Sequence, residues 1–135
     1  MKIDFIKTKH YYIQIDNSKN RVYFSVLARW NGIEDFSNFF DQWKEIVEKL
    51  EPQFTITSDL RLMPILSKDI EKLFSQIQCY LIENGLFHVA EVVAMNDISN
   101  LQITRISNHS ELPQNKFTNI EEAEEYLDKL IALTK

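Results

Sequence analysis

Residues 53–94 read QFTITSDLRLMPILSKDIEKLFSQIQCYLIENGLFHVAEVVA, and this stretch decides the fold. A strand-like run ends in Ser58-Asp59-Leu60-Arg61, passes through a loop containing Pro64, and enters an amphipathic helix that is followed by a second apolar run. A connection of this length normally returns the chain to a parallel neighbouring strand with a right-handed crossover. The stretch therefore predicts a β-loop-α-β unit in a protein of the α/β class.

Two strands are predicted before this unit. Apolar side chains alternate with polar ones over residues 10–16 and again over residues 21–29. The polar segment 17–20 between them is short enough to close an antiparallel hairpin. Residues 1–9 supply either an edge strand, over residues 2–6, or a flexible start.

The remaining periodicity predicts helices separated by strands. Residues 36–50 carry an aromatic and aliphatic stripe at helical spacing, formed by Phe36, Phe39, Phe40, Trp43, Ile46, Val47 and Leu50. Such a stripe is usually core, although part of it could lie at a homodimer interface. Residues 97–109 fit a helix better than a strand. Residues 118–131 form a terminal helix that opens on a capping box from Thr118 to Glu121.

Two more strands complete the expected order. Residues 86–94 are nearly all apolar, as in a central strand covered on both faces, with Glu91 as the exception. Lys116-Phe117 can form a short final strand. We therefore expect one α/β domain over residues 1–135, a mixed sheet flanked by helices in the order β-β-α-β-α-β-α-(β)-α.

Charge and cysteine content limit which partners, cross-links and metal sites are expected. The chain has 135 residues, with 20 acidic against 15 basic side chains and a formal charge of -5, which disfavours a nucleic-acid partner. Cys79 is the only cysteine, so neither an intrachain disulfide nor a zinc cluster is expected. No apolar run is long enough to cross a bilayer. These features predict a cytoplasmic protein.

Two segments resemble the SpoIIAA-like branch of the STAS superfamily. They are the strand end Ser58-Asp59-Leu60-Arg61-Leu62-Met63-Pro64 and the tail FTNIEEAEEYL over residues 117–127. The order of elements resembles that branch over roughly residues 10–130. The resemblance implies a mixed sheet flanked by helices and a regulatory binding role, such as anti-sigma factor antagonism. It does not imply catalysis or a cofactor.

One position departs from that family. Phosphorylatable relatives carry an Asp-Ser-Ser-Gly-like motif at the start of the helix after this strand, whereas this chain has Ser67-Lys68-Asp69-Ile70. Asp69 stands near the place of the modified serine, and the glycine is absent, so the standard phospho-switch is not expected. Ser67 remains a candidate acceptor. Its structural alternative is to cap the helix, while Asp69 favours the helix dipole.

The carboxyl ends of the strands are the expected binding region, because parallel α/β connections leave a crevice there. Trp30, Asp59, Arg61 and Asn96 follow strands there and could present an aromatic ring, a carboxylate and a guanidinium to a small ligand or a peptide. Ser67 and Asp69 join these candidates. The structural alternative is that Asp59 pairs with Arg61 while Trp30 covers the core.

No catalytic or metal-binding constellation is recognisable in the sequence. The three histidines lie on separate predicted elements, and the odd spacing of His88 and Glu91 puts them on opposite faces of a strand. We therefore expect a non-enzymatic regulatory or protein-interaction module without cofactor or metal, with an unknown protein partner or a second copy of itself. The alternative is a small-molecule or lipid-binding domain that uses the strand-end crevice.

Overall fold

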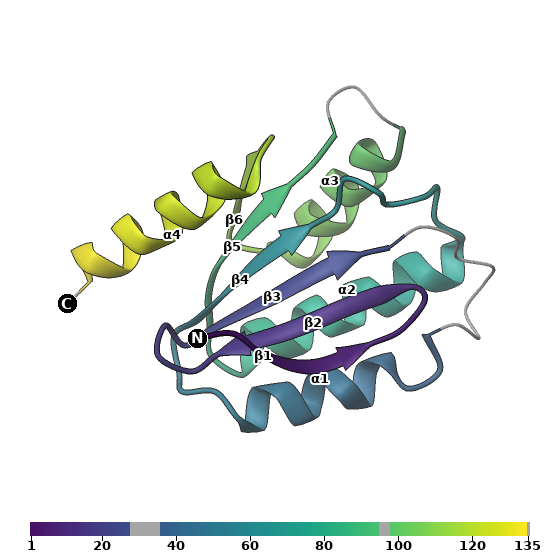
Figure 1. The fold of residues 1–135 in the computed structure, drawn as a ribbon. Helices are drawn as coiled ribbons and strands as arrows, with labels where there is room; N and C mark the ends of the chain where they lie inside the picture. The colour runs from purple at the N-terminus through teal and green to yellow at the C-terminus, as the bar shows by residue number, and fades with distance from the viewer. Residues whose placement is uncertain (28–35, 95–97, 135) are drawn as a thin grey trace.

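The elements assemble around one mixed β-sheet (Figure 1). A computed structural model describes residues 1–27, 36–94 and 98–134. Within these ranges the elements are β1 (Ile3–Lys7), β2 (Tyr11–Asp16), β3 (Arg21–Val26), α1 (Phe39–Glu48), β4 (Phe54–Asp59), α2 (Lys68–Glu83), β5 (Leu86–Val92), α3 (Ile98–Ser110), β6 (Gln114–Phe117) and α4 (Ile120–Leu133). This succession confirms the general α/β class, with β1 as the added edge strand.

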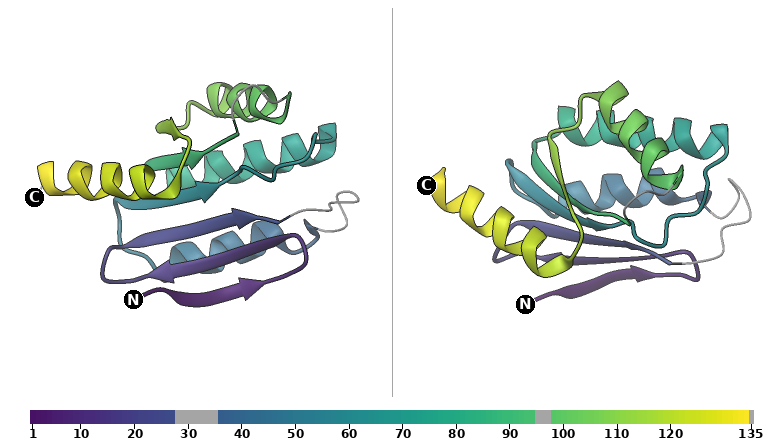
Figure 2. Two further views of the ribbon diagram at one scale, coloured as in Figure 1. Left: turned by 45° about the horizontal axis from the view of Figure 1, so that its top comes forward. Right: turned by 90° about the horizontal axis from the view of Figure 1, so that it is seen from above.

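The strand order in space is the order along the chain, from β1 to β6. Strands β1, β2 and β3 are antiparallel, and β3, β4, β5 and β6 are parallel. Each parallel crossover steps in the same direction, so the right-handed rule places α1, α2 and α3 on one face of the sheet. Figure 2 shows this layer, with α4 alone on the opposite face.

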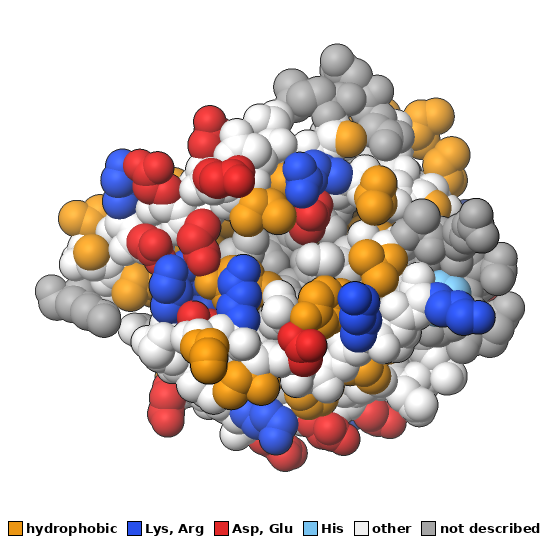
Figure 3. All heavy atoms as spheres, viewed as in Figure 1, with side chains coloured by type: hydrophobic (Ala, Val, Ile, Leu, Met, Phe, Trp, Pro, Cys, Tyr) orange, Lys and Arg blue, Asp and Glu red, His pale blue; other side chains and the backbone are white. Residues whose placement is uncertain are grey.

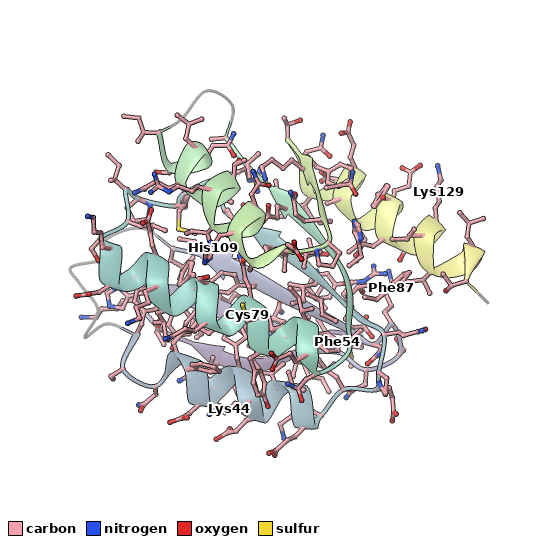
Figure 4. The ribbon with its side chains drawn as sticks, turned by 180° about the vertical axis from the view of Figure 1, so that it is seen from behind. Lys44, Phe54, Cys79, Phe87, His109 and Lys129 are labelled. Carbon is pink, nitrogen blue, oxygen red and sulfur yellow. The ribbon has the colours of Figure 1, made fainter. Side chains whose placement is uncertain are left out.

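The main core lies between the sheet and the three helices. Val22 and Phe24 of β3 face α1, whose Phe39, Trp43 and Ile46 are buried. Figure 4 shows α1, α2 and α3 side by side over this face. Most of the predicted aromatic stripe is therefore core, while its member Phe40 is half-buried and packs against Tyr80 and Lys44.

The opposite face has a smaller core where α4 crosses the sheet. Ala90 and Val92 of β5 pack against Ala123 and Leu127 of α4. Beside this core, the guanidinium of Arg21 contacts acidic side chains of α4. Helix α4 is therefore held to the sheet by a small apolar contact and by ion pairs with Arg21. Across the described ranges, no helix has the length and apolarity that crossing a bilayer requires.

The start of α4 differs from the sequence expectation. The N-cap is Asn119, whose Oδ1 accepts a hydrogen bond from the Glu122 amide at 2.8 Å, rather than Thr118. Asn119 has the extended backbone that an N-cap requires, and asparagine caps a helix at least as well as threonine. The predicted capping box is therefore wrong by one residue, although the helix itself is confirmed.

Candidate functional site

Asp59 and Arg61 form an ion pair at the carboxyl end of β4. Arg61 Nε donates to Asp59 Oδ1 at 2.9 Å and Nη2 donates to Oδ2 at 2.8 Å, so the contact is bidentate. This pairing with Asp59 raises the pKa of Arg61. The structural alternative to binding, in which Asp59 pairs with Arg61, is therefore present. Trp30 and Asn96 lie outside the described residues.

The strand order provides no switch point for a crevice in the described part of the sheet. Crevices of that kind open where the strand order of a parallel sheet reverses. In the sheet that the structure describes, the order runs from β1 to β6 without a reversal. The carboxyl ends of the strands therefore offer an outer surface of loops and helix starts instead of a switch point.

That surface is apolar next to the loop between β4 and α2. Leu60, Met63 and Leu66 of this loop turn inward and are buried. Leu62 and Ile65 of the same loop are exposed instead, with exposed fractions of 59% and 65%. Ile98 and Leu101 in the first turn of α3 are also exposed, with fractions of 60% and 70%. We call these four side chains the strand-end patch. Figure 3 shows hydrophobic side chains along this end of the molecule.

Gln102 holds the two halves of the strand-end patch together. Its side-chain amide bonds the backbone of Leu66, and it also donates to Glu71 of α2 at 3.3 Å. Glu71 in turn pairs with Arg105. The loop is therefore fixed to both α2 and α3. Sequence reasoning missed Gln102, because a glutamine on a helix carries no signal of such a distant backbone contact.

Ser67 and Asp69 stand where the loop enters α2. Ser67 Oγ accepts a hydrogen bond from the Ile70 amide at 3.3 Å, which makes Ser67 the N-cap. Asp69 is exposed in the first turn, where a negative charge suits the helix dipole. Both residues follow the loop of the strand-end patch in the sequence. Ser67 caps α2 and Asp69 lies in its first turn, which are the structural roles that the sequence offered as alternatives to binding.

His88 and Glu91 are on opposite faces of β5, as their spacing predicts. His88 Nε2 lies 2.8 Å from Asn115 Oδ1 on the α4 side. Glu91 is buried on the other side, and its Oε1 accepts from Lys116 Nζ at 3.0 Å. Burial raises the pKa of Glu91, and the nearby charge of Lys116 opposes this effect. These two residues cannot share one site.

The described cysteine and metal-binding side chain types form no further site. Cys79 is exposed on α2, so it is not a core residue. Within residues 1–27, 36–94 and 98–134, no group of three His, Cys, Asp or Glu side chains is placed to hold a metal ion.

Fold and surface together define a class: a mixed α/β domain with a six-stranded sheet, helices on both faces and an apolar end. No protein-family model matches the chain, and no curated protein matches it. Two solved structures from Pseudomonas aeruginosa are similar. One is apo-SiaC, with a TM-score of 0.55 and 16% identity, covering 86% of this chain and 98% of that chain.

The other is a second structure of SiaC, with a TM-score of 0.54 and 16% identity, covering 87% of this chain and 99% of that chain. At this identity the likeness concerns the fold alone. It supports the mixed α/β arrangement, whereas the SpoIIAA-like assignment stays a prediction.

Proposed function

We propose that this protein is a non-enzymatic regulatory module that binds another protein through the strand-end patch. The observation that carries the proposal is the gathering of four exposed large side chains on two segments that Gln102 joins. Single exposed apolar residues are ordinary on a protein surface, but a cluster bordered by polar groups is typical of an interaction site.

The polar neighbours of the patch suit the rim of a protein interface. Arg61 and Asp59 neutralise each other, so a partner meets no unpaired charge from this pair. Ser67 and Asp69 add a hydroxyl and a carboxylate at the start of α2. Interfaces of this kind combine an apolar centre with a polar, solvent-exposed rim. Trp30 and Asn96, which follow β3 and β5 in the sequence, stay candidates for partner binding on their sequence positions alone.

The remaining parts of the proposal rest on the sequence. Resemblance supports a SpoIIAA-like regulatory role without the standard phospho-switch, and the single cysteine suits the cytoplasm. The net charge of -5 argues against nucleic acid as the partner. A second copy of the chain is the simplest occupant of the patch, so a homodimer is part of the proposal.

Partner capture with matched variants tests the interaction. The bait is the full chain as wild type, as Leu62→Ser/Leu101→Ser in the patch, and as Leu133→Ser, which changes a still more exposed leucine at the far end of α4. We expect a protein, or a dimer in native mass spectrometry, that wild type and Leu133→Ser retain and the double variant loses at least about tenfold. Equal retention by all three would refute the proposal.

The alternative is a small-molecule or lipid-binding surface at the strand ends. The observation that favours it is the exposed guanidinium of Arg61, close in sequence to Leu62 and Ile65. An anionic amphiphile would fit this combination by replacing Asp59 as the partner of Arg61. Decanoate is a suitable probe. A rise in Tm with decanoate that Arg61→Ala abolishes would favour this alternative, because a ligand that binds only the native state stabilises it.

A further inference from the structure

A cavity of about 70 Å³ lies between the sheet and helices α1, α2 and α3. Its walls are mostly apolar and include the aromatic rings of Phe24, Trp43 and Phe74. Three polar side chains also line it, namely Ser58, Gln78 and Glu91. Apolar walls with a few convergent polar groups are the usual character of a small-molecule site.

The polar groups reach the cavity from three different elements. Ser58 of β4 and Glu91 of β5 are direct partners in the parallel register, and both side chains are buried on the helix face. Gln78 comes from α2, where its amide oxygen accepts from Ser110 of α3. The cavity thus has a polar end where Ser58 and Glu91 lie on adjacent strands, and Gln78 lines it from α2.

Charge at this end selects a neutral ligand. The Glu91 carboxylate is already paired with Lys116 at 3.0 Å. A cationic ligand would lose its hydration and meet the charge of Lys116, while an anionic ligand would meet Glu91. A hydroxyl group can both donate to the Glu91 carboxylate and accept from Ser58 without adding charge.

Volume limits the size of the ligand. An engineered cavity of about 150 Å³ holds benzene, so a cavity of about half that size holds roughly three or four heavy atoms. We propose that the cavity is a binding site for a small neutral molecule with an apolar body and a hydroxyl group, such as a short-chain alcohol, with the hydroxyl directed to Ser58 and Glu91.

The cavity is separate from the strand-end patch, although one loop contributes to both. Leu60 and Met63 line the cavity, whereas Leu62 points outward. Two residues of the cavity lining are only half-buried, namely Gln78 of α2 and Leu112 in the turn after α3. This inference therefore goes beyond the proposed interaction with a protein and does not depend on it.

Methyl NMR of the full chain, titrated with 2-propanol, tests the site. We expect saturable shifts of the methyl groups of Ile77 and Ile106, which line the cavity, with a Kd on the order of millimolar for so small a ligand. Val89→Ile adds a methylene to the cavity wall and should weaken binding at least about fivefold, and Glu91→Gln should weaken it about threefold. Leu133→Ser should bind as wild type does.

Ser58→Thr is a second filling variant, for use if Val89→Ile fails to fold. Unsaturable shifts, or equal binding by wild type and the filling variants, would overturn the proposal. Shifts confined to Ile65 and Ile98 would also overturn it, because they would place the alcohol on the strand-end patch. Partner capture is measured without alcohol, so the failure of one proposal is distinguishable from the failure of the other.

Discussion

The side-chain amide of Gln102 bonds both backbone groups of Leu66. Gln102 Oε1 accepts from the Leu66 amide at 2.8 Å, and Nε2 donates to the Leu66 carbonyl at 3.0 Å. One side chain of α3 thus replaces the partners that a strand would give to this loop residue. The contact holds the loop after β4 against α3, so the arrangement of the strand-end patch depends on it.

Gln102→Ala should therefore destabilise the protein and loosen the loop. Three hydrogen bonds are lost, two to Leu66 and one to Glu71, and the backbone groups of the buried Leu66 are left without their protein partners, which costs about 1–3 kcal/mol. Urea unfolding gives the loss, and faster amide exchange at Leu66 locates it. Gln76→Ala, an exposed glutamine on α2, is the matched control and should change stability by less than about 0.5 kcal/mol.

Neighbouring residues of α3 should respond very differently to truncation. Leu101 is exposed in the strand-end patch, whereas Ile103 is buried in the main core. Leu101→Ala should change the free energy of unfolding by less than about 0.5 kcal/mol, and Ile103→Ala should lower it by about 2–5 kcal/mol. Thermal or urea unfolding of the two variants measures both values. Comparable losses would mean that Leu101 packs within the fold.

Periodicity was enough to predict the elements of this fold. The change from two-residue alternation to helical spacing after the hairpin, and back again at residues 86–94, is a local property of the chain. Even the burial of residues 89–92 of β5 follows from its nearly continuous apolar run. The start of α4 shifted by one residue, because Thr118 and Asn119 are both good caps and only the backbone decides between them.

The functional surface was predictable only in part. Asp59, Arg61 and Ser67 could be placed at strand and helix ends from local pattern, and the structure describes them there. Gln102 and the cavity beside Glu91 depend on contacts between segments far apart in the chain. Alternation in the sequence predicts that a side chain faces the helices, but it does not predict whether the packing between the sheet and the helices leaves a cavity.

Arg21 should be more important for stability than the exposed cation next to it in the same cluster. Its side chain is only 1% exposed, donates to Thr55 Oγ1 at 2.9 Å and to Asp128 Oδ1 at 2.9 Å, and also pairs with Glu124. Arg21→Ala removes the buried partner of the Thr55 hydroxyl and leaves Glu124 and Asp128 with Lys19 as their remaining cation, at a cost of about 2–3 kcal/mol.

Lys19→Ala is the matched comparison, since Lys19 contacts the same two acids from the surface. It should cost no more than about 1 kcal/mol, and high salt should reduce its effect further. Urea unfolding at low and at high salt measures both variants. Equal losses would show that the cluster acts through surface charge, and would contradict a special role for the buried guanidinium.

Glu91 should make the protein less stable as the pH rises above about 4.3. Burial raises the pKa of Glu91 in the folded protein, while Lys116 partly offsets this rise. In the unfolded chain the carboxyl ionises near pH 4.3. Between that value and the higher folded value the unfolded state releases the proton more readily, so the stability of the folded state falls with increasing pH.

Glu91→Gln removes this ionisation while keeping the size of the side chain. The variant should match wild type near pH 4 and become progressively more stable than wild type as the pH rises toward 7, because Lys116 is partly exposed and water can solvate it. Urea unfolding at several pH values measures the difference, and Glu83→Gln, on the exposed end of α2, should show no such trend. A difference that stays constant from pH 4 to pH 7 would mean that Glu91 ionises in the folded protein as readily as in the unfolded chain.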